Sequence, residues 1–228
     1  MEKLVYLIHQ DAAAPGSDLR RALIDKATPT LREAGASQIA VNVHDEHVSQ
    51  GAGVTISRSE PPIRAMVSFW LQNVDDRAPC EAALAQHSAA LHGYLTVESR
   101  PVVHSPPLGE RAPGANLVTP INKKADISYE QFIGLWTHEH KRVACETQST
   151  FAYVRNAVVR PLTAAAPQRD GIVEESFPIE ALSDPHVWYD CDDDDEYKRR
   201  LKRMMDSVNA FLDLGVLESI PMSEYWLG

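Results

Sequence analysis

The sequence contains no long apolar run. No window of its 228 residues approaches the roughly 18 uninterrupted apolar residues of a membrane-spanning helix. The N-terminal segment 1–16 turns polar after one short apolar run, which is too early for the hydrophobic region and cleavage site of a signal peptide. A cytoplasmic protein with no membrane partner is therefore expected.

Cysteine, basic patches and phosphate-binding loops are also scarce. The three cysteines, Cys80, Cys145 and Cys191, are an odd number without paired spacing, which indicates reduced thiols and gives no zinc signature. The net charge of −10 and the absence of a long Lys/Arg patch disfavour nucleic acid as a partner. Glycine-rich phosphate loops and a G-x-S-x-G elbow are missing, which argues against nucleotide-driven and serine-hydrolase chemistry.

Two acidic segments raise the question of a metal. His44 and His47 have H-x-x-H spacing beside Asp45 and Glu46 and could ligate zinc if they shared one face, but a strand end followed by a loop usually leaves such a run solvated. The run 190–196 lacks the alternation and the glycine of a calcium loop, and acids before a basic segment are typical of a helix start. We expect no metal site.

The order of segments occurs twice along the chain. Hydrophobic periodicity predicts strands and helices in the order β-α-β-β-α-β, then a proline-rich linker, then the same order again. In the first half we expect strands at 3–10, 37–46, 63–72 and 95–103, and helices at 17–35, kinked or ended near Pro29, and at 78–94. In the second half we expect strands at 115–123, 151–162, 171–179 and 216–227, and helices at 128–146 and 196–214.

This order predicts an α+β fold made of two ferredoxin-like halves. The expected boundaries are 1–103 for the first half, 104–114 for the linker and 115–228 for the second half. Each four-stranded sheet would carry helices on one face only, and its bare face must be covered. Packing the two halves sheet to sheet would hide both bare faces.

The helix predicted from Ser128 to Glu146 carries the most informative side chains. Ser128 followed by Gln131 is a capping-box pattern. At about 100° per residue, Trp136 lies on the apolar stripe, His140 lies at its edge and His138 points to the far side. One histidine is therefore expected to face inward and the other outward.

The second half resembles the EthD-domain family of the dimeric α+β barrel superfamily. The resemblance rests on the helix SYEQFIGLWTHEHKRVA, which places Trp136 and His140 at W-x-x-x-H spacing, and on the segments YVRNAVV, DGIVEESF and FLDLGVLESIPMSEYW. It covers about residues 115–228 and implies an internal tandem in which the halves pack like the subunits of a dimeric relative.

The first half resembles this fold only in the order of its elements. When its first helix is aligned by the serine caps, Asp25 and Pro29 replace the tryptophan and the histidine; when it is aligned by the apolar stripe, Leu23 and Ala27 replace them. In both alignments the pair is absent, so one working cavity is expected, in the second half.

Histidine is the side chain best suited to proton transfer near neutrality, and burial beside an aromatic ring would keep it neutral. His140 is therefore the candidate acid or base, Trp136 an apolar wall, and Tyr153 a donor to a developing oxyanion. Asn156 and Glu174 are added as candidates for substrate binding. The alternative interpretation is that His140 and Trp136 are simply part of a satisfied core.

The resemblance implies a cofactor-independent enzyme that acts on a hydrophobic or aromatic carbonyl compound by histidine acid/base chemistry, as a lyase, decarboxylase or cyclase. Alternatives are a non-catalytic binding or accessory protein of a catabolic pathway and a cofactor-free monooxygenase. Haem binding through a histidine has no motif to support it. Pairing of two chains into a homodimer is left open.

Overall fold

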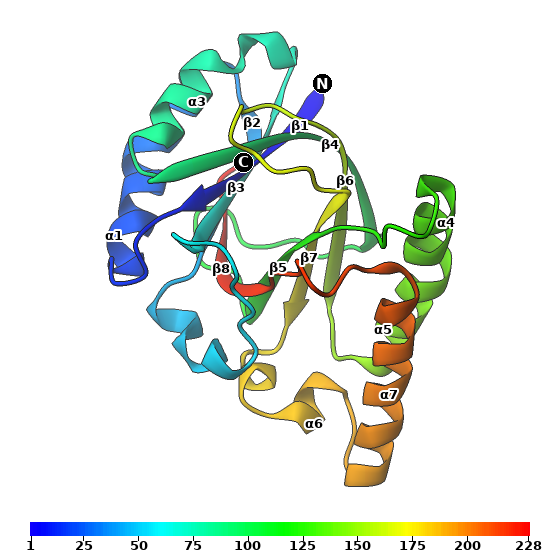
Figure 1. The fold of residues 1–228 in the computed structure, drawn as a ribbon. Helices are drawn as coiled ribbons and strands as arrows, with labels where there is room; N and C mark the ends of the chain where they lie inside the picture. The colour runs from blue at the N-terminus through cyan, green and yellow to red at the C-terminus, as the bar shows by residue number, and fades with distance from the viewer.

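Eight antiparallel strands close into a barrel in the computed structural model, which describes residues 1–228 (Figure 1). Around the barrel the strand order is β1-β3-β2-β8-β5-β7-β6-β4. The strands are β1 (Glu2–His9), β2 (Ser37–Val43), β3 (Ile63–Leu71), β4 (Ala90–Val102), β5 (Ala115–Ile121), β6 (Ala152–Pro161), β7 (Gly171–Phe177) and β8 (Ile220–Trp226).

The barrel consists of two halves of the same topology. The first four strands form a sheet in the order β4-β1-β3-β2, and the last four form one in the order β8-β5-β7-β6. Two seams join the halves, one where Val41 of β2 pairs with Tyr225 of β8 and one where Val97 of β4 pairs with Ala157 of β6. The predicted fold class, two ferredoxin-like halves forming a dimeric α+β barrel, is confirmed.

Helices cover the outside of each half. The first half carries α1 (Gly16–Arg21), η1 (Ala22–Ala27), α2 (Thr28–Glu33), η2 (Glu46–Gly53), η3 (Val74–Arg77) and α3 (Ala78–Ala85). The second half carries α4 (Tyr129–Gly134), η4 (Leu135–His140), α5 (Lys141–Thr147), η5 (Ile179–Leu182), α6 (Pro185–Trp188) and α7 (Asp194–Phe211). None of these helices combines the length and the apolar character needed to cross a bilayer.

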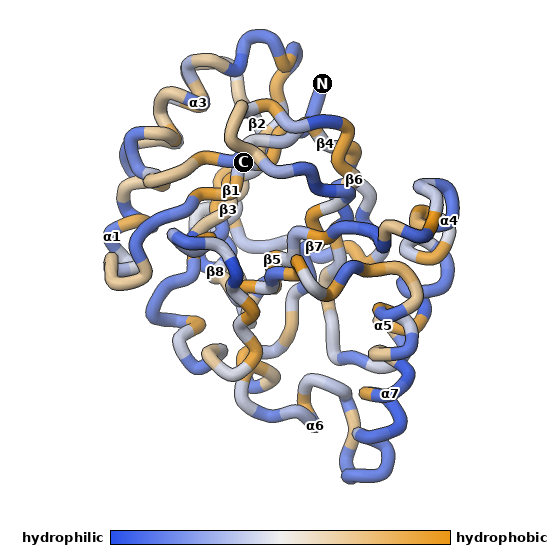
Figure 2. The backbone as a smooth tube through the Cα atoms, viewed as in Figure 1, coloured by the Kyte–Doolittle hydropathy of each residue, from blue (hydrophilic) through white to orange (hydrophobic).

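Strand alternation divides the buried side chains between the barrel interior and the two helix-covered faces. On β1, for example, Leu4 and Tyr6 pack in the core under the first-half helices, whereas Val5 and Leu7 point into the barrel. Figure 2 shows apolar residues along the strands and hydrophilic ones along α7. The apolar middle of the barrel interior contains Val5, Leu7, Ile63, Met66, Tyr94, Val118, Ile172, Ile220 and Met222.

Both long helices contain a π-helical segment at the same place. In the second half α4, η4 and α5 form one continuous helix, and the predicted capping box of Ser128 and Gln131 is present. In the first half, η1 precedes Pro29, which lacks the N–H needed for a regular helical hydrogen bond. The two π segments align Leu23 with Trp136 and Ala27 with His140, which supports the alignment by apolar stripe.

Several predicted boundaries differ from the structure by a few residues, and two of the differences have a clear physical cause. The helix expected at 78–94 ends at Ala85, and β4 begins at Ala90, which pairs with His9 of β1. Gly93 allows this pairing because a Cβ there would lie 2.4 Å from the Tyr6 ring. Tertiary pairing therefore overrides the helical propensity of this alanine- and leucine-rich segment.

The other boundary concerns the acidic run, which is a helix start as predicted. Helix α7 begins at Asp194 rather than Glu196, because the Asp193 carboxylate accepts hydrogen bonds from the backbone N–H groups of Asp195 and Glu196. The segment 104–114, predicted as a linker, runs beside β8 and is hydrogen-bonded to it from Gly109 and Ala112.

Candidate functional site

A cavity of about 790 Å³ lies between the second-half sheet and the helices that cover it. The sheet contributes Leu117 and Val173, and α7 contributes Met204, Val208 and Phe211 from its inward face. The segment from Gln50 to Arg58 and helix α6 complete the wall. Figure 1 shows α5, α6 and α7 beside the sheet of the second half. Because most of the lining side chains are apolar or aromatic, the cavity suits a hydrophobic ligand.

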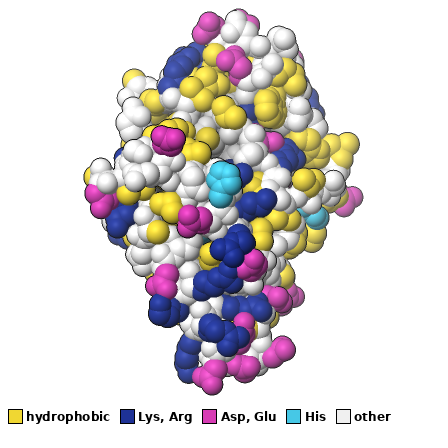
Figure 3. All heavy atoms as spheres, turned by 90° about the vertical axis from the view of Figure 1, so that its right-hand side faces the viewer, with side chains coloured by type: hydrophobic (Ala, Val, Ile, Leu, Met, Phe, Trp, Pro, Cys, Tyr) yellow, Lys and Arg dark blue, Asp and Glu magenta, His cyan; other side chains and the backbone are white.

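The opposite face of α7 is charged. Ion pairs along it include Arg200 with Glu196 and Lys202 with Asp206, and Arg203 reaches Glu146 of α5. Figure 3 shows basic and acidic side chains interleaved over the lower part of this face of the molecule. The helix is thus amphipathic, with its apolar stripe in the cavity and its bases matched by neighbouring acids.

His140 lies in the cavity wall on η4. Its side chain is buried, its ring packs 5.1 Å from the Phe211 ring, and its Nδ1 lies 3.0 Å from Ser207 Oγ. Burial lowers the pKa of His140 to about 4, so the imidazole is neutral at physiological pH. Nε2 has no hydrogen-bond partner in the protein, so it is available to a ligand. The inward position of His140 and the exposed position of His138 agree with the sequence pattern.

Trp136 forms the cavity wall beside His140, and residues of the sheet fix its position. Its Nε1 donates a hydrogen bond to Tyr153 Oη over 3.2 Å, and its ring lies against Gly171, where a Cβ would approach to 2.5 Å. Tyr153 is on the helix-facing side of β6, as the prediction required, but it does not line the cavity. Burial also raises the pKa of its phenol. The geometry therefore makes Tyr153 a positioning residue for Trp136 and does not place it at a ligand.

Asn156 and Glu174 lie on the other side of the sheet. Both are buried inside the barrel, where Asn156 Nδ2 donates to Glu174 Oε1 over 2.8 Å. The expectation that they share a site with His140 is corrected, because side chains alternate between the faces of a strand and Asn156 is three residues from Tyr153. The sheet therefore separates the Asn156 carboxamide and the Glu174 carboxylate from the cavity that contains His140.

Glu175 is an acidic residue of the sheet that does line the cavity, and sequence reasoning missed it. It is paired directly with Tyr153 across β6 and β7 on the helix-facing side. Its Oε1 is buried without a hydrogen-bond partner, and burial raises the pKa of Glu175 to about 7. Glu175 shares one face of β7 with Val173 and Phe177, but because both faces of this strand are buried, the sequence pattern alone does not separate it from Glu174.

This burial predicts a pH-dependent effect of Glu175→Gln. The folded protein retains a proton on Glu175 that the unfolded chain releases near pH 4.5, so this group's contribution to stability falls as the pH rises from about 4.5 to about 7. The glutamine of the variant does not titrate, so the variant does not lose stability in this way. Its free energy of unfolding relative to wild type should rise over the same interval by about 1–3 kcal/mol and then level off. Urea denaturation at several pH values would measure this, and a pH-independent difference would contradict the assignment.

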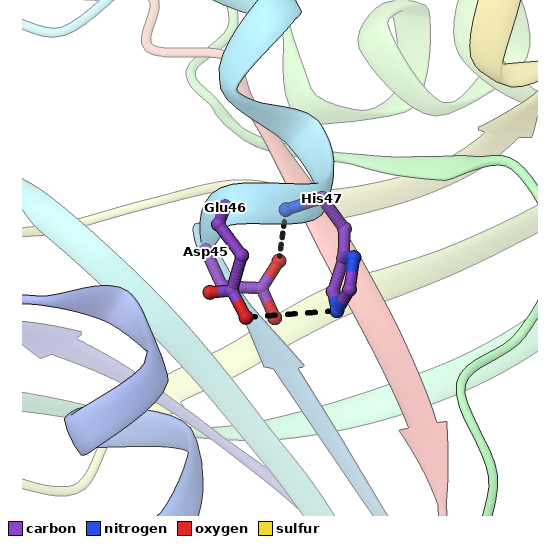
Figure 4. A group of neighbouring side chains, drawn as sticks. All are labelled: Asp45, Glu46 and His47. Carbon is purple, nitrogen blue, oxygen red and sulfur yellow. Dashed lines mark hydrogen bonds and ion pairs between the residues drawn. The ribbon is translucent and has the colours of Figure 1, made fainter.

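The cluster with possible metal-ligand spacing is occupied by a cation from the protein itself. Asp45, Glu46 and His47 lie together at the start of η2 (Figure 4). Arg20 Nη1 lies 2.6 Å from Asp45 Oδ2 and 2.9 Å from Glu46 Oε1. Asp45 also accepts hydrogen bonds from Ser223 and Tyr225, whereas the His44 ring is hydrogen-bonded to the Pro221 carbonyl. This arrangement ties η2 to β8 and leaves no shared face for the H-x-x-H pair.

The cavity meets only some of the requirements of a haem site: it has a histidine ligand but lacks free cations for the haem carboxylates. His140 Nε2 could bind a haem iron, and the contact of its Nδ1 with Ser207 would hold the imidazole in place for that role. The only cation in the lining is Arg58, whose guanidinium already donates to the carbonyls of Leu214 and Leu217. With Glu175 also in the wall, the residues suit a neutral ligand better than the two carboxylates of a haem.

Comparison with known proteins identifies the fold. No protein-family model and no curated protein matches the sequence. Among solved structures, an anthrone oxidase-like protein is similar with a TM-score of 0.56 and 10% identity, over 100% of this chain and 93% of that one. A proposed monooxygenase from Lactobacillus acidophilus NCFM gives 0.52 and 9%, over 100% and 96% of the two chains. A tryptophan-to-valine variant of chlorite dismutase from Candidatus Nitrospira defluvii gives 0.50 and 13%, over 97% and 91%. At these identities the likeness shows the dimeric α+β barrel fold alone.

Proposed function

We propose that the protein is a cofactor-independent enzyme of the monooxygenase type, acting on a neutral aromatic or polycyclic carbonyl compound in the helix-side cavity. The observation that carries this proposal is the uncharged His140, with Nε2 free, in the wall of a mostly apolar cavity of about 790 Å³. The names of two structural neighbours, an anthrone oxidase-like protein and a proposed monooxygenase, support oxygen as the co-reactant. The EthD-like motifs around Trp136 and His140 are consistent with a small hydrophobic substrate.

The chemistry needs one base and one acid. His140 Nε2 takes a proton from an activated carbon next to the aromatic rings, and the resulting carbanion is delocalised into the substrate carbonyl. Oxygen then adds to that carbon to give a peroxide, which loses water and leaves a second carbonyl group. With anthrone the balance is one anthrone and one O2 to one anthraquinone and one water.

Glu175 fits the role of the acid. A carboxyl group with a pKa near 7 is partly protonated at neutral pH and can donate a hydrogen bond to the developing oxyanion. The imidazolium formed on His140 is in turn stabilised by the negative charge that develops on the substrate. Trp136 forms an apolar wall for the aromatic rings, and Tyr153 holds it in place.

Anthrone is the first compound to test. Purified protein at catalytic concentration should consume one O2 for each anthraquinone formed, well above the spontaneous rate, and should lose this activity under nitrogen. Absorbance above 350 nm before substrate is added would reveal a bound chromophoric cofactor and would contradict the cofactor-independent mechanism. Saturable binding of anthrone without turnover would support the alternative, a non-catalytic binding protein.

A further inference from the structure

A second cavity lies inside the barrel, on the opposite side of the sheet from His140. It has a volume of about 200 Å³ and occupies one end of the barrel interior, beyond the apolar middle layer. Trp70 and Trp226 line it together with segment 104–106, and the lining also includes the exposed Gln38. The volume corresponds to about seven water molecules at ~30 Å³ each, so a molecule of only a few heavy atoms would fit.

We propose that this barrel cavity is a second ligand site that takes a small organic cation carrying an ammonium group. It is distinct from the helix-side cavity and does not depend on the activity proposed there.

The charges in the barrel cavity do not balance. Lys3 Nζ lies 2.5 Å from Glu98 Oε2 and 3.6 Å from Glu174 Oε1, and Arg100 Nε lies 2.6 Å from Glu98 Oε1. Glu224 also lines the cavity, but its carboxylate has neither a hydrogen bond nor an ion pair in the protein. Two cations thus face three carboxylates, and the third carboxylate lacks a partner. A ligand with one positive charge would match the deficit.

An unpartnered amide oxygen belongs to the lining of the same cavity as Glu224. Asn116 is 4% exposed and uses its Nδ2 to donate to Asn42 Oδ1 over 2.9 Å, which leaves its Oδ1 buried with no partner. Asn116 of β5 is paired with Met222 of β8, two residues before Glu224, so the free oxygen and the free carboxylate belong to neighbouring strands. Both groups accept hydrogen bonds. An ammonium group, with three N–H donors and no acceptor, is the complementary chemistry.

The two tryptophans strengthen the preference for a cation. Indole rings attract ammonium groups through their faces, and the lining of this cavity includes the indoles of Trp70 and Trp226. A metal ion is a poorer match, because Lys3 and Arg100 already pair with Glu98, and the carboxylates in this cavity do not converge as a three-ligand group.

Protonation of Glu224 should be linked to binding. Burial and the nearby Glu174 raise the pKa of Glu224 to about 7, while Arg100 and Lys3 act in the opposite direction. Glu98 and His104 also face this end of the barrel. A bound ammonium would favour the ionised carboxylate, so the amine should bind more tightly at pH 8 than at pH 6 and should release protons near pH 7.

Three four-carbon probes that differ only at one end provide the test. Isothermal titration calorimetry at pH 8 should show 4-amino-1-butanol binding at least about tenfold more tightly than 1,4-butanediol, with no binding of 4-hydroxybutanoate. Glu224→Gln should reduce the affinity for the amine at least about tenfold, whereas Glu110→Gln, which removes an exposed charge, should leave it unchanged.

Equal affinity for the amine and the diol, or an unchanged affinity in Glu224→Gln, would overturn the proposal and leave water as the occupant. Because the Glu224→Gln variant could fail to fold, a second test uses the unmodified protein. Titrations at pH 7 in two buffers of different ionisation enthalpy should reveal proton release on amine binding, and its absence would also overturn the proposal.

Discussion

Replacing His140 by Ala should abolish oxidation of the aromatic substrate while leaving the fold intact. Removal of a general base typically lowers the rate by about 10²–10⁴-fold, and no other histidine lines the cavity. The substitution enlarges a cavity that already exists and removes the contacts of His140 with Ser207 and Phe211 of α7, but it leaves the capping box and the rest of the apolar packing of α7 in place. Anthrone should still bind, so the loss should appear in kcat rather than in KM.

The matched control is His138→Ala, which removes an exposed histidine from the same π-helical segment. This variant should keep the wild-type rate. Steady-state oxygen consumption, with circular dichroism and melting temperature as checks on folding, would compare the two variants. Full activity in His140→Ala would refute the assignment of the base.

Replacing Lys3 by Met should lower the free energy of unfolding more than any other substitution considered for this protein. Lys3 is 4% exposed and contacts the buried carboxylates of Glu98 and Glu174 inside the barrel. Removing one partner from a buried ion pair leaves an uncompensated charge and typically costs about 3–5 kcal/mol. Arg100 can still neutralise Glu98, so most of the penalty should fall on Glu174.

Lys202→Met is the control, since Lys202 forms an ion pair with Asp206 on the exposed face of α7. Such a surface pair contributes at most about 1 kcal/mol. Urea denaturation of both variants at pH 7 would give the two free energies of unfolding. Similar values for the two variants would show that the barrel interior is more hydrated than its burial indicates.

The sequence was sufficient for the order of the elements and for the face of the principal helix. The apolar spacing around Trp136 and His140 predicted which side chains turn inward, because helical periodicity reports burial directly. The π-helical turn could not be predicted, since a spacing of four residues places both side chains inward in either helix type. The end of α3 was missed because the strand pairing of Ala90 with His9 joins residues far apart in sequence.

The candidate residues on the sheet were harder to predict. In GIVEESF nearly every side chain is buried, since one face packs under helices and the other lines the barrel. The usual alternation of polar and apolar residues is therefore absent, and the pattern did not distinguish Glu174 from Glu175. Asn116 and Glu224 escaped notice for the same reason. The role proposed for them depends on the closure of the barrel, which brings β2, β5 and β8 together.

The seam between β2 and β8 has a consequence for how the chain folds. It pairs Val41 with Tyr225, so one edge of the first sheet stays open until nearly the whole chain is available. Contacts between such distant residues carry a large loop-closure entropy and slow the final step of folding. Until β8 docks, the exposed edge of β2 can pair with the β8 of another molecule. Exchange of this last strand between chains is therefore the misfolding route that the barrel's topology favours at high protein concentration.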